Sequence, residues 1–207
     1  MVNGENIDAF INYNYVPFSK TQTIKRIIMI WISSVALCFL GKGSMLWVIP
    51  TGIVSLTISV FFAVLITKYN FSKTSRYMCD GVFYLYMSII LNLASYRVMT
   101  LKIGANWLLL IILLLLLLAC ILLFMIVTLL NIKAGRFVQK NASKKVVSLP
   151  FICGLCGILV AKFVLQEQTQ EATLQMGAIL LLILSFVVSI PSVNLLRVVM
   201  YRRYMNL

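Results

Sequence analysis

Long apolar stretches separated by short polar segments make up most of the chain. A helix needs about 20 mostly apolar residues to cross the roughly 30 Å hydrocarbon layer of a membrane, because each residue adds about 1.5 Å. Six segments meet this requirement when their flanks are included. The predicted spans cover residues 24–41, 46–67, 77–97, 106–130, 146–165 and 172–196. This pattern predicts an all-α, polytopic membrane helix bundle.

The six segments are not equally clear. Residues 107–127 are apolar without interruption. The segment that begins the bundle is the shortest, and Lys25 and Arg26 can extend it because long basic side chains reach back to the membrane surface. Pro191 predicts a kink near the end of the last span. The helix is expected to continue beyond that kink toward Arg203.

Composition agrees with this assignment. Hydrophobic residues make up 62% of the 207 positions and charged residues only 11%. An ordinary soluble domain has about 25% charged residues. A water-soluble protein of this size would have too few charges to cover its apolar surface.

The basic residues alternate from one connection to the next. Fourteen Lys and Arg fall in the N-terminal segment, the second and fourth connections and the C-terminus, three fall in the other connections, and Lys162 lies inside a span. Cytoplasmic connections carry the excess of Lys and Arg. We therefore expect both termini in the cytoplasm of a cell that holds the chain in its inner or plasma membrane.

Domain organisation follows from this topology. Residues 1–23 form a cytoplasmic or interfacial segment, residues 24–203 a single six-helix domain, and residues 197–207 a basic cytoplasmic tail that overlaps the last helix. The three external turns are short, so the six spans are expected to form three tight hairpins.

Polar residues gather on one face of the third predicted span. Asp80, Tyr84, Ser88 and Asn92 recur every four residues, and the series continues with Ser95, Tyr96 and Arg97. Such a face must be buried against protein or water in a membrane. Two interpretations remain open: the residues line a path or groove for a ligand, or they form hydrogen bonds between helices.

Two further patterns concern the same span. Asp80 is the one acidic residue near a span, and its expected partners are Arg76, one turn earlier, or Lys68. A row of small residues in the second span predicts a packing seam against the third; the row comprises Thr51, Ser55, Ser59, Ala63 and Thr67.

Lys162 lies near the outer end of the fifth predicted span, close to Glu167. The ordinary interpretation is that Lys162 extends to the membrane surface, and the sharper one is an anion-attracting site at the outer mouth. The fourth connection is a candidate contact for anionic lipid headgroups or for an acidic partner; its basic residues are Lys133, Arg136, Lys140, Lys144 and Lys145. Nucleic-acid binding is not expected, because the charge is spread over four short segments.

The chain contains no histidine. This excludes His-ligated haem, His-containing zinc sites and nucleophiles activated by a His base. No catalytic residue, metal site or cofactor is expected. A nucleotide-binding loop of the GxxxxGK[ST] type is also missing from the sequence, so any transport energy must come from another chain.

Three functions remain. The first is a small permease-like or transport-system membrane subunit that works with a partner such as a cytoplasmic ATPase, with a homo-oligomer also compatible. The second is an immunity, protection or sensor protein directed at membrane-active agents. The third, an intramembrane lipid-modifying enzyme, is poorly supported because Asp80, Glu167 and Glu171 are too few and too scattered to hold a catalytic metal.

Overall fold

A computed structural model of the chain describes residues 4–13, 19–40, 44–68, 72–104, 106–140 and 170–205. Every regular element in these residues is helical. The elements are α1 (Gly4–Asn12), α2 (Lys20–Phe39), α3 (Ser44–Lys68), α4 (Lys73–Ile103), α5 (Trp107–Lys133), α6 (Arg136–Lys140), α8 (Gln170–Ser189), the 3₁₀ turn η1 (Ile190–Val193) and α9 (Asn194–Met205).

Five helical segments within this described part are long and apolar enough to cross a membrane. They are Lys20–Phe39, Trp47–Thr67, Lys73–Leu101, Trp107–Lys133 and Leu174–Arg203. The all-helical prediction is therefore confirmed, as is the presence of several apolar helices. The predicted span over residues 146–165 lies outside the described residues, so the count of six stays a prediction.

Polar side chains mark the helix ends. Ser72 caps α4 by accepting a hydrogen bond from the Ser75 amide at 3.2 Å. Asn106 caps α5 and accepts from the Leu108 and Leu109 amides at 3.0 and 3.3 Å. Between these two helices, Gly104 adopts a φ of +81°, which glycine tolerates without steric cost. The end of α4 and the start of α5 thus follow from Gly104 and Asn106.

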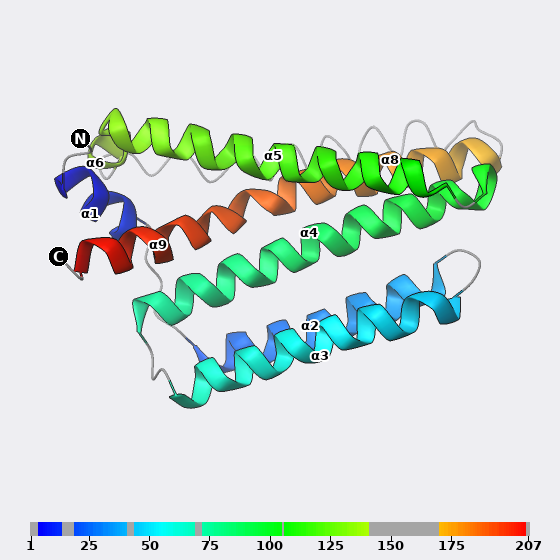
Figure 1. Ribbon diagram of the computed structural model, residues 1–207, viewed down its shortest axis with the longest axis horizontal. Helices are drawn as coiled ribbons and strands as arrows, with labels where there is room; N and C mark the ends of the chain where they lie inside the picture. Colours follow the sequence, from blue (N-terminus) through cyan, green and yellow to red (C-terminus); the bar gives the residue numbers. More distant parts are fainter. Residues whose placement is uncertain are drawn as a thin grey trace.

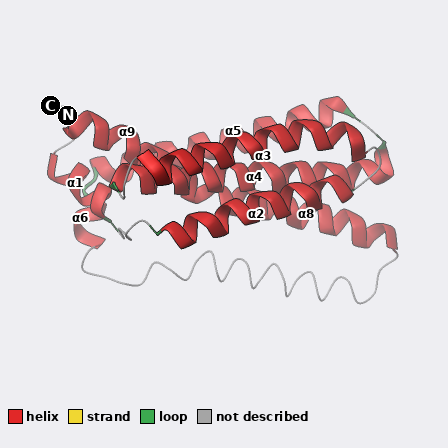
Figure 2. Cartoon of the chain, turned by 90° about the horizontal axis from the view of Figure 1, so that it is seen from below, coloured by secondary structure: helices red, strands yellow, loops and turns green. Residues whose placement is uncertain are grey.

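α4 is the central helix of the bundle. α2 and α3 lie on one side of it, and α5, α8 and α9 lie on the other (Figures 1 and 2). Its most extensive contact is with α8, whereas α3 packs chiefly on α2. A helix of 31 residues is about 46 Å long, which exceeds the roughly 30 Å hydrocarbon layer. Both ends of α4 can therefore reach the membrane surfaces.

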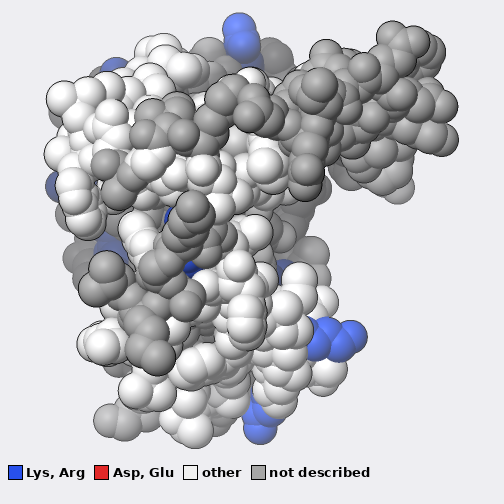
Figure 3. Space-filling view, turned by 90° about the vertical axis from the view of Figure 1, so that its right-hand side faces the viewer, with Lys and Arg blue, Asp and Glu red and all other residues white. Residues whose placement is uncertain are grey.

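The bundle has two distinct ends. α1, α6 and α9 lie together at one end, where α2 and α4 also begin and α3 and α5 finish (Figure 1). We call this the terminal end. The described Lys and Arg residues all lie there except Arg97 and Lys102. In Figure 3, which is viewed from the opposite end, Lys and Arg appear as separate patches between other side chains, and no Asp or Glu is visible among the described side chains.

The outward surface of the helices is apolar. In α5 a narrow stripe that includes Leu110, Leu113 and Leu117 is buried, while Leu108 and Leu115 are 66% and 58% exposed. Leucines this exposed are stable when lipid rather than water surrounds the helix.

One close helix contact depends on glycine. A Cβ atom added to Gly81 of α4 would lie 2.6 Å from the Leu195 side chain and 3.0 Å from the Leu195 backbone nitrogen in α9. The two helices can approach this closely only without a side chain at residue 81. The predicted interruption at Pro191 is present as η1, and α9 continues through Arg203 as expected.

Candidate functional site: polar groups along the central helix

A charged cluster occupies the terminal end of α4. The Asp80 carboxylate accepts a hydrogen bond from Arg76 Nε at 2.9 Å and forms a second ion pair with Arg26 of α2. Arg76 Nη1 also donates to the Gln22 side chain at 2.6 Å. The predicted pair with Arg76 is present. The partner that the sequence did not reveal, Arg26, lies 54 positions earlier and reaches Asp80 only through helix packing.

This cluster carries more positive than negative charge. Arg26 and Arg76 surround a single carboxylate, and Arg26 Nη1 is buried with no hydrogen-bond partner among the described residues. The Arg26 guanidinium lies 5.6 Å from the centre of the Phe83 ring. Contact with the electron-rich ring face stabilises the excess charge.

A third arginine at this end is held by aromatic rings. The Arg197 guanidinium lies 5.0 Å from the Phe10 ring centre and 5.1 Å from that of Tyr77. Tyr77 also donates a hydrogen bond to the Ile11 carbonyl. The N-terminal helix is therefore attached to α4 and α9 through its apolar residues, and Phe10 is buried in protein.

A neutral hydroxyl cluster joins three helices in the middle of the bundle. Ser34 of α2 and Ser55 of α3 lie 2.6 Å apart, and the Tyr86 hydroxyl of α4 is hydrogen-bonded to both, 3.0 Å from Ser55. All three side chains are buried. Tyr86 lies off the four-residue polar row, so that row gave no signal for it.

Two members of the predicted polar series or its continuation bond to neighbouring backbones. Asn92 donates to the Leu113 carbonyl of α5 at 3.3 Å, and Ser95 donates to the Ala178 carbonyl of α8 at 2.7 Å. Both side chains are fully buried. Each therefore links α4 to a different helix, which is the helix-contact interpretation of the polar face.

The other predicted residues of this face make local contacts. Ser88 donates to the Leu85 carbonyl of its own helix at 2.8 Å. The partly buried Tyr84 ring packs against Phe83, with 5.3 Å between ring centres. Tyr96 is buried and lies 6.3 Å from the Trp47 ring of α3.

Arg97 occupies the opposite end of the series. Its guanidinium donates to the carbonyls of Leu37 and Cys38 in the last turns of α2 and lies 5.7 Å from the Trp47 ring centre. The residue is only 1% exposed. The last carbonyls of a helix have no partner within that helix, and a cation is favourable beside them. Arg97 therefore caps the C-terminal end of α2.

Charge and neutral polarity are segregated along α4. Arg97 lies seventeen positions after Asp80, which is about 25 Å at 1.5 Å per residue. This spacing places the two charged groups near the two edges of a hydrocarbon layer about 30 Å thick. The neutral hydroxyl and amide groups occupy the interval between them.

The small-residue row of α3 faces a different neighbour from the one predicted. Ser59 accepts a hydrogen bond from Trp31 of α2 at 3.1 Å, and Thr51 lies 3.6 Å from the Cys38 sulfur, also in α2. The expected seam against the third span is therefore corrected. It runs mainly along α2, because α2 and α3 pair closely, and it reaches α4 only where Ser55 meets Tyr86.

Two of the cavities formed by described residues flank α4. One, of about 240 Å³, is an apolar groove between α3 and α4; its lining includes Trp47, Val54, Ile58, Ile89 and Leu93. The other, of about 310 Å³, lies at the terminal end between α3, α4 and α9. Neither cavity contains Asp80, Asn92 or Arg97 in its lining.

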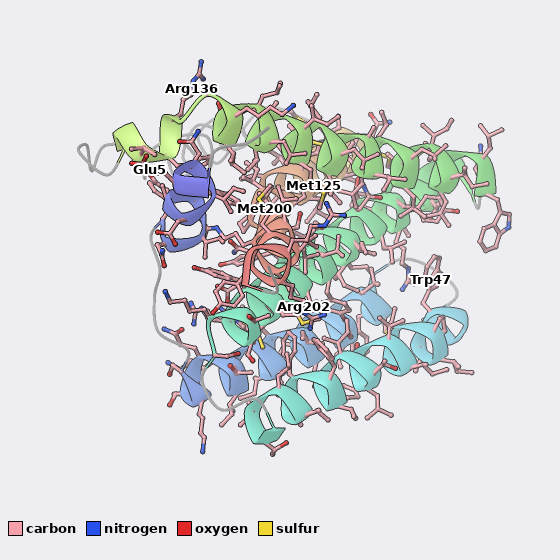
Figure 4. The ribbon with its side chains drawn as sticks, turned by 60° about the vertical axis from the view of Figure 1, so that its left-hand side comes forward. Glu5, Trp47, Met125, Arg136, Met200 and Arg202 are labelled. Carbon is pink, nitrogen blue, oxygen red and sulfur yellow. The ribbon has the colours of Figure 1, made fainter. Side chains whose placement is uncertain are left out.

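The predicted cytoplasmic contact is only partly described. Lys133 and Arg136 are exposed, and Arg136 points away from the bundle (Figure 4). Phe137 of α6 packs on Phe10 and Tyr13 with ring centres 4.9 and 5.4 Å apart, which fixes this corner against the N-terminal helix. The Lys140 side chain, Lys144 and Lys145 lie outside the described residues, as do Lys162 and Glu167 of the predicted outer-mouth site.

No group of three or more His, Cys, Asp or Glu residues that could hold a metal ion occurs in the described part of the chain. Comparison with known proteins gave no match to a family model, to a curated protein or to a solved structure.

Proposed function

We propose that the chain is a non-catalytic, multi-pass protein of the cell membrane, with six spans and both termini in the cytoplasm, that serves as the membrane subunit of a transport system. The described α5 ends at the terminal end and α8 begins at the opposite end (Figure 1). A sixth span over residues 146–165 would join these two positions. Most described Lys and Arg residues lie at the terminal end, which supports a cytoplasmic location for that end of the bundle.

The observation that carries this proposal is the corner between α5 and α6. Exposed Lys133 and Arg136 stand on a helix end that aromatic contacts hold in place. A rigid basic surface at the cytoplasmic side is complementary to an acidic groove on a soluble partner. A role that depends on a partner also agrees with the polar residues Asn92 and Ser95 of α4. Both bond to neighbouring helices and line neither cavity, so they are not part of a solute path within the described part of this chain.

The test is purification of the tagged chain from its native cells in mild detergent. The wild-type chain is expected to retain a nucleotide-hydrolysing partner, and the K133E/R136E variant to lose it. The matched control is K20E/K25E, which makes the same charge change on exposed lysines of α2 at the same end. Absence of a nucleotide-binding partner, together with no solute movement in liposomes containing the purified proteins, would contradict the proposal.

A second candidate function rests on the apolar groove between α3 and α4. This groove of about 240 Å³ lies between two membrane-spanning segments and is lined almost wholly by apolar side chains. It suits an apolar part of a membrane-active peptide, as a protection or sensor protein would need.

Expression in a sensitive host followed by peptide challenge tests this candidate. Wild-type protein is expected to raise survival, and V54F, which fills the groove, to abolish the effect. V60F is the control, because Val60 is similarly exposed on α3 but does not line the groove. Unchanged survival with the wild-type protein would count against the candidate.

A further inference from the structure

The cavity at the terminal end has an amphiphilic lining. Its apolar residues come from α3 and α4, and its hydroxyl-bearing residues from the start of α4; the lining comprises Phe61, Leu65 and Met78 together with Ser72, Thr74 and Ser75. Arg202 of α9 completes it. The cavity measures about 310 Å³. Apolar surface, hydroxyl groups and a cation therefore line one cavity.

The depth of these residues matches the boundary between headgroup and acyl chain. Ser72 and Thr74 lie at the start of α4, whereas Phe61 lies seven residues before the end of α3, about 10 Å into the bundle. The polar headgroup region adds about 5–7 Å on each side of the hydrocarbon layer. A molecule in this cavity would have its polar group at the helix ends and its apolar part along Phe61.

Arg202 has no competing partner among the described residues. The side chain is exposed on the face of α9 that looks toward α3 and α4 (Figure 4). No hydrogen bond or ion pair ties its guanidinium to the part of the chain that the structure describes. Asp80, the acidic residue of α4, already forms ion pairs with Arg26 and Arg76. A guanidinium at such a place binds a phosphate through two parallel hydrogen bonds.

We propose that this cavity is a binding site for an anionic phospholipid. The Arg202 guanidinium binds the phosphodiester, the hydroxyl of Thr74 adds a hydrogen bond, and the first part of one acyl chain lies on Phe61, Leu65 and Met78. Excess basic charge at the terminal end favours an anionic over a zwitterionic headgroup, because the ammonium group of the latter would be repelled. The site would serve a transport subunit or a protection protein equally, so its test is independent of both.

The experiment is native mass spectrometry of the full chain in detergent, titrated with phosphatidylglycerol or phosphatidylcholine. The wild-type chain is expected to retain one phosphatidylglycerol in preference to phosphatidylcholine. R202Q is expected to weaken phosphatidylglycerol binding about tenfold, because it removes the charged hydrogen bonds that the Arg202 guanidinium makes directly to the phosphate. The matched control, R203Q, removes the neighbouring exposed charge outside the cavity and is expected to change binding less than twofold.

A second variant tests the cavity itself. T74F fills it and is expected to abolish retention of the lipid, whereas V64F adds the same ring at an exposed position of α3 outside the cavity and is expected to leave it intact. Equal weakening by R202Q and R203Q would show general surface attraction and overturn the proposal. Equal retention of both lipids, or undiminished binding by T74F, would overturn it too.

Discussion

At the scale of single residues, the close approach of two helices can depend on a glycine, which has no side chain to keep them apart. Gly81 allows α4 to touch Leu195, whereas Gly52 of α3 has open space where a Cβ would be added. The two glycines are both helical, so they lose similar backbone entropy on folding. They differ only in their surroundings, which makes them a matched pair.

We expect G81A to destabilise the protein by about 1–3 kcal/mol, because the new methyl group must displace the Leu195 backbone or force helix separation. G52A should stabilise it by about 0.5–1 kcal/mol through helix propensity alone. Reversible unfolding in mixed detergent and SDS, followed by circular dichroism, measures both. If G81A unfolds at the same SDS fraction as the wild type, the close packing of α4 on α9 is wrong.

Arg97 provides the second test at this scale. Replacement by Met removes the charged donor from the Leu37 and Cys38 carbonyls and leaves Leu37 with the hydrogen bond from the Leu40 amide at 3.3 Å. We expect a loss of about 2 kcal/mol, because hydrogen bonds to charged groups contribute about 1.5–3 kcal/mol. R97K should be intermediate, since an ammonium group lacks the planar fork of arginine. The same unfolding assay applies, with R203M as the exposed control. Equal stability of R97M and R203M would rule out this role.

At the scale of elements, the hydroxyl cluster explains why α2, α3 and α4 pack as a unit. Ser34, Ser55 and Tyr86 each come from a different helix, and every one of them is buried. In lipid, apolar side chains provide no hydrophobic force between helices, so small residues and interhelical hydrogen bonds have a larger share in specifying the contact.

Removing the Tyr86 hydroxyl should therefore have a measurable effect of modest size. We expect Y86F to cost about 0.6 kcal/mol, the average for hydrogen bonds between membrane helices. Y84F is the control, because Tyr84 is only partly buried and has no side-chain hydrogen bond in the described part of the chain. A double-mutant cycle with S55A isolates the contact. Additive losses in that cycle would mean that the two hydroxyl groups are not coupled.

The sequence predicted the positions of the helices better than the contacts between them. The apolar periods place α2, α3 and α5 within four residues of their observed bounds, because length and hydropathy alone define a span. α4 extends six residues beyond its predicted end, and the predicted span 172–196 covers α8, η1 and the start of α9. The Asp80–Arg76 pair was predictable since both residues lie on one helix, four positions apart. Arg26, Tyr86 and the Gly81–Leu195 contact were not, because they arise from the pairing of helices, which a single hydropathy pattern does not encode.

At the scale of the whole molecule, the ends of the bundle determine what a topology experiment should find. Lys20 and Arg203 lie at the terminal end, and Trp107 at the other. In a background with the native cysteines replaced by alanine, W107C should react with a membrane-impermeant maleimide in intact cells. K20C and R203C should react only after permeabilisation, because positive charge is retained in the cytoplasm.

The same labelling tests whether the chain crosses the membrane between α5 and α8, as the proposed sixth span requires. Lys133 lies at the end of α5 and Leu174 near the start of α8, and both are exposed. The chain between them must cross the membrane an odd number of times if K133C and L174C react from opposite sides, and an even number if they react from the same side. We expect opposite sides, with L174C labelled in intact cells. Labelling of K20C and R203C from different sides would contradict an even number of spans. Labelling of both in intact cells would reverse the proposed orientation. Lys133 and Arg136 would then face the outside of the cell, where a cytoplasmic partner could not bind them.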